Sequence, residues 1–230
     1  MVTQKKIYDL TTNATAAQMA ASQDHSAQQR AKSLGLLDSV ADVRVLNGTI
    51  NRRTALFVDM SGCRRHSVPV GRRIASVLAA LATSTIHTYA FDSLAYPLEA
   101  PNVAPASWTD AIAGLSGGES TAIGAPLEAM RMKAQIVEQI AIVTDGRENS
   151  RPRFVDVFHG YRMQLGVRPS VVVIRVGDYS HAFEHTLREN DVEVRGVAFD
   201  GPGSLSRLVQ TLSRPSRLDT LVDRVGGPAW

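Results

Sequence analysis

Short apolar runs recur along the chain, separated by stretches in which apolar residues fall at helical spacing. The runs are too short for helices and suit buried strands, because a strand covered on both faces is apolar at nearly every position. They predict strands over residues 54–58, 86–91, 138–144, 170–176 and 192–199. Residues 94–98 are expected to form an edge strand, because Pro97 cannot donate a sheet hydrogen bond.

Helical periodicity fills the gaps between these runs. We expect helices over residues 68–83, 121–133, 152–165, 181–189, 205–212 and 217–225, and a short one that begins near Ser107. Single helices between strands predict right-handed crossovers and a parallel sheet covered on both faces. The predicted fold class is therefore α/β: a three-layer, doubly wound, mostly parallel sheet of about six strands with one antiparallel edge strand.

The amino-terminal part differs from the rest. Between Thr11 and Val43 the chain is rich in alanine and glutamine and has few large apolar residues, which predicts a helix with a weak core-facing stripe. We therefore divide the chain into a helical extension over residues 1–48 and a domain over residues 49–230. The full length of 230 residues, 44% of them hydrophobic, suffices for one sizeable core without disulfides or a structural metal.

Cysteine usage and hydropathy bear on the compartment. The only cysteine, Cys63, cannot form a disulfide within the chain. The sequence contains no run of ~18 apolar residues and no signal-like amino terminus. We therefore expect a cytoplasmic protein without a membrane partner.

The candidate chemistry lies where two of the predicted strands end. Asp59 follows one apolar run with Ser61 two residues later, and Asp145 follows another. Thr121 comes after a glycine turn at residues 117–118 and adds a hydroxyl from a third loop. Ligands of such sheets sit at the carboxyl ends of the strands, where the crossovers change face, so pairing the two strands brings both carboxylates there. Oxygen ligands of this kind suit a hard divalent ion, Mg²⁺ or Mn²⁺. The alternative is that Asp59, Ser61 and Asp145 only cap helices.

Positive charge gathers near the same loops. The net charge is +3 with a pI near 9.2, and nearly all of the positive charge is arginine. Arginine forks bind carboxylate or phosphate with two parallel hydrogen bonds. We expect a partner-binding rim around the site, against the alternative that these side chains are only solvated. The rim residues are Arg64, Arg65, Arg147 and Arg151.

Taken together, these loops resemble a known family. The pattern of Asp59, Ser61 and residue 63, Thr121 with Leu127 six positions later, and Thr144-Asp145-Gly146 is similar to the von Willebrand factor A domain and its metal-ion-dependent adhesion site (MIDAS). The resemblance covers about residues 53–199. It implies a Rossmann-like fold and a metal-topped crevice that binds an acidic side chain of a protein partner.

A narrower likeness is to the A domains of bacterial Ro-type (TROVE) proteins. It lies in residues 89–92, 120–127, 137–145 and 212–218. Ro-type proteins usually join this domain to a ring of helical repeats that binds small noncoding RNA. These 230 residues hold the A domain and one helical extension, and we expect no such ring in them. RNA binding therefore does not transfer with the resemblance.

Two departures from the family bear on the metal. Cys63 stands where the family has a second serine ligand, and a thiol is a poor ligand for a hard ion. Arg64 and Arg65 follow directly, and their charge opposes a cation at the site. A degenerate site without metal is thus an alternative.

Other chemistries find less support. His181 and His185 lie one helical turn apart and could hold zinc, but no third ligand is predicted, so a solvated helix face is the simpler interpretation. Cys63 as a nucleophile lacks a predictable histidine partner. A phosphotransferase-like site needs a second carboxylate at position 61, which is serine, and no glycine fingerprint follows the first strand to bind a nucleotide.

The sequence thus favours a non-enzymatic binding module that uses a divalent metal to bind a carboxylate of a protein partner. One alternative is an RNA-associated, Ro-like subunit whose arginines contact phosphate. Another is a scaffold that docks a partner through its amino-terminal extension.

Overall fold

A computed structural model describes residues 49–62, 64–98, 118–201 and 203–214. Within these ranges a six-stranded sheet has the order β3-β2-β1-β4-β5-β6. Its strands are β1 (Thr54–Asp59), β2 (Ile86–Phe91), β3 (Ala95–Leu98), β4 (Gln139–Thr144), β5 (Ser170–Arg175) and β6 (Val194–Ala198). All neighbouring strands are parallel except β2 and β3, which are antiparallel. The predicted fold class, with its antiparallel edge strand, is confirmed.

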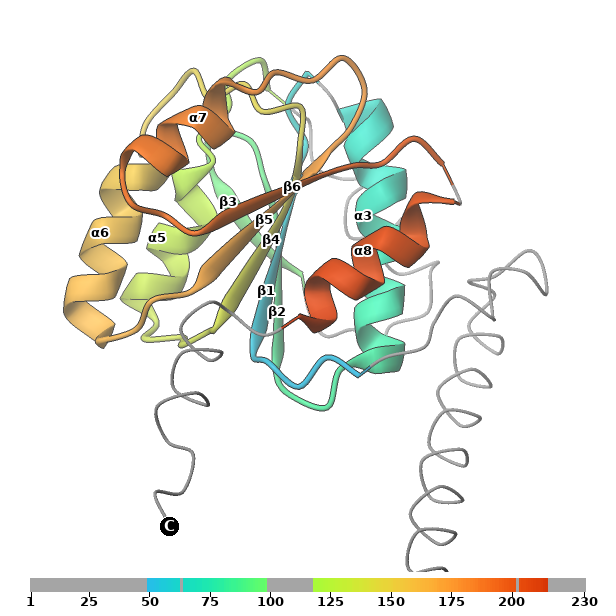
Figure 1. The fold of residues 1–230 in the computed structure, drawn as a ribbon. Helices are drawn as coiled ribbons and strands as arrows, with labels where there is room; N and C mark the ends of the chain where they lie inside the picture. The colour runs from blue at the N-terminus through green and yellow to red at the C-terminus, as the bar shows by residue number, and fades with distance from the viewer. Residues whose placement is uncertain (1–48, 63, 99–117, 202, 215–230) are drawn as a thin grey trace, which may run out of the picture.

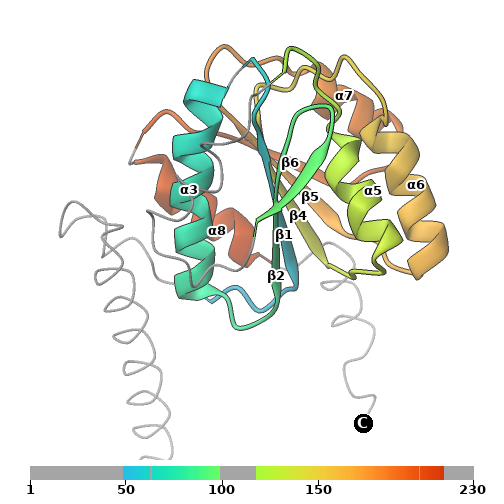
Figure 2. The ribbon, with the colours of Figure 1, turned by 180° about the vertical axis from the view of Figure 1, so that it is seen from behind.

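Helices cover both faces of this sheet. They are α3 (Arg64–Leu81), α5 (Gly124–Met132), α6 (Phe154–Leu165), α7 (Ala182–Glu189) and α8 (Ser204–Ser213). Figure 1 shows α5, α6 and α7 on one side of the sheet and α3 with α8 on the other, and the reverse view in Figure 2 agrees. None of the helices in the described ranges combines the length and apolar character needed to cross a bilayer.

Each face of the sheet has its own apolar core, because successive strand residues point to opposite sides. Leu56 and Val58 face α3 and α8 and pack with Leu78 and Leu208. Ala55 and Phe57 face the other layer, in which Leu127 of α5, Phe158 of α6 and Leu187 of α7 are buried. The central strands are therefore apolar at nearly every position, which explains why their runs are unbroken in the sequence.

Two of the described helices start three or more residues away from the predicted position. The helix predicted from residue 68 begins at Arg64. The prediction started too late because the first turn is polar and the apolar spacing starts only at Val68. The helix predicted from residue 121 begins at Gly124, because hydrogen bonds to another loop hold Thr121 outside it. The helices predicted over residues 11–43, near residue 107 and over residues 217–225 lie outside the described residues, as does the boundary at residue 48.

Candidate metal centre

The candidate centre lies at the carboxyl end of the sheet between β1 and β4. These two strands are parallel neighbours with Val58 paired to Val143, so Asp59 ends its strand beside Thr144 and close to Asp145. The helix after β1, α3, packs on one face of the sheet, and the helix after β4, α6, packs on the other. The crossovers change face here, and this is the position where open α/β sheets bind ligands.

Asp59 is fully buried and anchors the first loop. Its Oδ1 accepts hydrogen bonds from the Ser61 backbone N at 2.9 Å and from the Ser61 Oγ at 2.6 Å. Its Oδ2 accepts from the Thr144 Oγ1 at 2.7 Å, which joins the ends of β1 and β4. Thr144 Oγ1 in turn accepts from the Gly146 N at 3.0 Å. The role of Thr144 could not be predicted from the sequence, because a threonine that ends a strand has many other uses.

The direction of these hydrogen bonds decides what Ser61 can do. Its hydroxyl proton is directed to Asp59, which leaves the lone pairs of the Oγ for another partner. A hydroxyl that ligates a cation must be turned in this way. Thr144, by contrast, both donates and accepts within the protein, and its hydroxyl joins Asp59 to the loop after β4.

The electrostatics favour a positive charge at this point. Burial raises the pKa of Asp59 above its ordinary value, and the nearby negative charge of Asp145 contributes to the rise. Hydrogen bonds from Ser61 and Thr144 oppose the shift without cancelling it. Two carboxylates that repel each other in a buried setting are stabilised by a cation between them.

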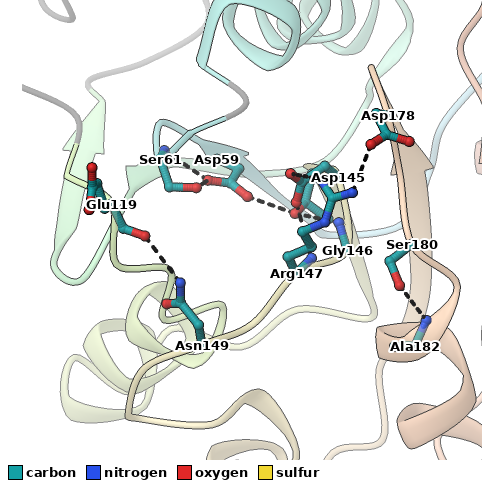
Figure 3. Close-up of polar contacts among 11 residues, drawn as sticks. Asp59, Ser61, Glu119, Asp145, Gly146, Arg147, Asn149, Asp178, Ser180 and Ala182 are labelled. Atoms are coloured by element: carbon teal, nitrogen blue, oxygen red, sulfur yellow. Dashed lines mark hydrogen bonds and ion pairs between the residues drawn. The ribbon is translucent and has the colours of Figure 1, made fainter.

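Thr121 belongs to a third loop that is fastened to the loop after β4. The Thr121 N donates to Asn149 Oδ1 at 2.7 Å, and the Thr121 carbonyl accepts from the Asn149 N at 3.1 Å. The Asn149 Nδ2 also donates to the Glu119 carbonyl at 3.1 Å (Figure 3). The Thr121 side chain is buried, with 4% of the residue exposed. Asn149 therefore positions this loop, a role that the sequence did not indicate.

Asp92, directly after β2, holds the same loop from the other side. Its backbone carbonyl accepts from the Ala122 N at 2.8 Å, and its Oδ2 accepts from the Gly118 N at 3.3 Å. Asp92 is 4% exposed, and its Oδ1 accepts from the Leu94 N. This third strand-end carboxylate is used in backbone contacts, which makes it a positioning residue.

Asp145 is engaged by a side chain from its own loop. Its Oδ1 accepts from the Arg147 N at 3.0 Å, and its Oδ2 lies 3.1 Å from the Arg147 Nη1. Arg147 Nη2 lies 3.0 Å from Asp178 Oδ2, in the loop after β5. Figure 3 shows the arginine folded back between the two acids, with Asp59 and Ser61 on the far side of Asp145.

Two of the other predicted rim residues, Arg65 and Arg151, are exposed. Arg65 is exposed on α3, and the 84% exposed side chain of Arg151 lies 3.8 Å from Asp156. Cys63 and the side chain of Arg64 lie outside the described residues. The structure therefore brings Asp59, Ser61 and Asp145 to one edge and ties the Thr121 loop to it.

The donor set agrees in kind with a hard dication. It consists of carboxylate and hydroxyl oxygens, the ligands that Mg²⁺ and Mn²⁺ prefer. Within the described ranges, histidine, cysteine, aspartate and glutamate form no group of three or more that could hold a metal. His181, directly before α7, and His185, within it, are both exposed and lie near Glu184 and Glu189 respectively.

Comparison with solved structures identifies the fold. The Ro (RSR) protein of Deinococcus radiodurans matches with a TM-score of 0.51 and 14% identity, over 74% of this chain and 36% of that one. Proximal thread matrix protein 1 of the mussel byssus, with a zinc-occupied MIDAS motif, matches with a TM-score of 0.50 and 12% identity, over 72% and 48%. The chain has a von Willebrand factor A-type fold.

A third structure, the PilB minor pilin of Streptococcus sanguinis, matches with a TM-score of 0.50 and 14% identity, over 79% of this chain and 64% of that one. The chain thus spans less than two thirds of the length of each of these three proteins. No protein-family model and no curated protein matches the sequence.

Proposed function

We propose that this von Willebrand factor A-type domain is a non-enzymatic binding module whose divalent-metal crevice binds an acidic group of a protein partner. The observation that carries the proposal is the buried Asp59, whose bond to Ser61 leaves the hydroxyl lone pairs available, beside Asp145 on the neighbouring strand end. One neighbour of the same fold has a zinc-occupied MIDAS motif, which supports a metal at this edge.

Asp59, Ser61, Thr121 and Asp145 would hold the ion, the acids directly or through water. Bound Mg²⁺ or Mn²⁺ supplies positive charge and a coordination position for an outside carboxylate oxygen. Cys63 at the position of a second serine ligand would lower the affinity, because sulfur suits softer metals. Arg65 and Arg151, both of which are exposed, would add favourable charge for an acidic partner.

Isothermal titration with Mn²⁺ and Mg²⁺ tests the metal. We expect saturable binding by the wild type and a loss of affinity of about tenfold or more in Asp145→Ala, because removing one of two carboxylates removes charge and a ligand. Asp200→Ala, which removes an exposed acid after β6 at the same edge, should bind like the wild type. Absence of binding by the wild type would overturn the metal claim.

The partner chemistry needs a separate measurement. A short peptide with one aspartate should bind to the Mn²⁺-loaded protein, and EDTA or replacement of that aspartate by asparagine should abolish binding. If the two peptides bound equally, the carboxylate part of the proposal would fail while the metal part stood.

RNA contact is the second candidate, which the net charge of +3 suggests. The described structure supports it less, because arginines at this edge already lie near acids: Arg147 near Asp145, Arg151 near Asp156 and Arg153 near Glu148. Binding of a small structured RNA that falls steeply with salt but is unaffected by EDTA would favour this candidate.

A further inference from the structure

Arg147 makes a contact with the proposed metal ligand that the family resemblance does not explain. Its guanidinium bridges two carboxylates, with Nη1 3.1 Å from Asp145 Oδ2 and Nη2 3.0 Å from Asp178 Oδ2 (Figure 3). The Asp145 side chain is 12% exposed and that of Asp178 is 96% exposed. The bridge therefore joins a nearly buried carboxylate to an exposed one.

This bridge uses the same carboxylate that a cation needs. Both oxygens of Asp145 take part in it, because Oδ1 accepts from the Arg147 backbone N at 3.0 Å while Oδ2 contacts the guanidinium. The guanidinium also brings a full positive charge to within hydrogen-bond distance of a metal ligand. A dication at the same carboxylate would be repelled by that charge.

A backbone hydrogen bond holds the loop that carries Asp178 close to Asp145. The Ser180 N donates to the Asp145 carbonyl at 2.6 Å. A side chain at Gly146 would lie 2.3 Å from the Ser180 carbonyl, which shows how closely the two loops approach. Asp178 thus stands at a set position from which it can hold the arginine over Asp145.

We propose that the Arg147 guanidinium is an internal counter-cation for Asp145 and that Asp178 holds it there as a latch. The guanidinium must leave Asp145 before a divalent ion binds. Once displaced, the guanidinium lies at the rim of the crevice, where it pairs with the carboxylate of the incoming partner. This inference rests on the proposed metal-binding function. It makes Arg147 and Asp178 the residues that set the affinity for the ion and couple ion binding to partner binding.

Replacing Asp178 distinguishes the latch from a simple electrostatic effect, because the two predict opposite changes in cation affinity. If Asp178 acts only as a nearby negative charge, its removal weakens cation binding. If it holds the arginine on Asp145, its removal frees Asp145 and strengthens cation binding. The side chain is almost fully exposed, so Asp178→Asn should fold like the wild type.

The experiment is titration of the full chain with Mn²⁺, with wild type, Asp178→Asn, Arg147→Lys and Asp200→Asn compared at one ionic strength. We expect Asp178→Asn to bind Mn²⁺ about two- to fivefold more tightly, which is the range of exposed ion pairs. Arg147→Lys, which keeps the charge but cannot span two carboxylates, should also bind more tightly. Asp200→Asn makes the same charge change after β6 and should not gain affinity.

Each result has a distinct meaning. Tighter binding by both latch variants, without a gain in Asp200→Asn, supports the latch. Wild-type or weaker binding by Asp178→Asn and Arg147→Lys overturns the latch and leaves the metal-binding function intact. Absence of Mn²⁺ binding by all four proteins overturns both the metal-binding function and the latch.

Discussion

Gly146 shows how one residue allows two loops to approach each other at the carboxyl end of the sheet. Its φ of +79° lies in the left-handed region, and a Cβ at this position would lie 2.3 Å from the Ser180 carbonyl oxygen. Only glycine satisfies both demands. The sequence pattern of Thr144, Asp145 and Gly146 predicted a turn at a strand end. It could not indicate that the glycine is required by a loop more than thirty residues away, since that contact exists only in the folded chain.

Replacing Gly146 by alanine should destabilise the protein by about 2–4 kcal/mol, because backbone strain adds to a backbone clash. Gly166 is the matched control: its φ is +66°, and a Cβ there would have no atom within 4 Å. Gly166→Ala should therefore cost only about 1 kcal/mol. Urea unfolding followed by circular dichroism measures both. Equal losses in the two variants would mean that Ser180 moves aside freely.

At the scale of elements, the strands were predictable and the ties between loops were not. A central strand such as β1 is buried at every position, so its apolar run marks both ends. The start of α3 was missed, because its first turn is polar. Asn149 was missed as well, since an asparagine side chain that holds another loop leaves no periodic signal. The placement of the two strand-end acids at one edge could be predicted, while the residues that position the loops around them could not.

Helix α7 illustrates the same limit. The sequence indicated a solvated face around His181 and His185, yet Glu184 between them is 1% exposed and faces the sheet. Its Oε1 lies 2.7 Å from Arg175 of β5, and its Oε2 lies 3.0 Å from Arg188. The ion pair with Arg175 fastens α7 to the sheet. A buried pair of this kind cannot be inferred from helical spacing, because the spacing does not distinguish a buried glutamate from an exposed one.

Glu184→Ala should therefore destabilise the protein by about 3–5 kcal/mol, because it leaves Arg175, with 15% of its side chain exposed, near the core without this carboxylate. Glu189→Ala on the same helix is the control, since its side chain is 71% exposed and 4.0 Å from His185. The control should change stability by less than about 0.5 kcal/mol. Thermal unfolding at constant pH compares them, and a small loss in Glu184→Ala would show that α7 is held by its apolar contacts alone.

At the scale of the molecule, the sheet is the shared wall of two cores. Alternating strands and helices predicted the layers, and the two strand-end acids predicted that β1 and β4 are neighbours. Both predictions rest on the rule that parallel strands meet their ligands at a common edge. The sheet joins the layers mechanically, because the same strands contribute Leu56 to one core and Phe57 to the other. The two faces should therefore unfold as one unit.

Leu78→Ala tests this coupling. Leu78 is fully buried on α3, and its truncation should cost about 2–5 kcal/mol. If the faces are coupled through the sheet, amide protons of α5 on the opposite face lose the same free energy of protection from hydrogen exchange as those of α3. Met163→Ala, at a position 86% exposed on α6, should leave both helices unchanged. Loss of protection confined to α3 would contradict cooperative unfolding. Equal losses instead mean that Asp59 and Asp145 are held at a fixed spacing by a single folding unit, as a preformed metal site requires.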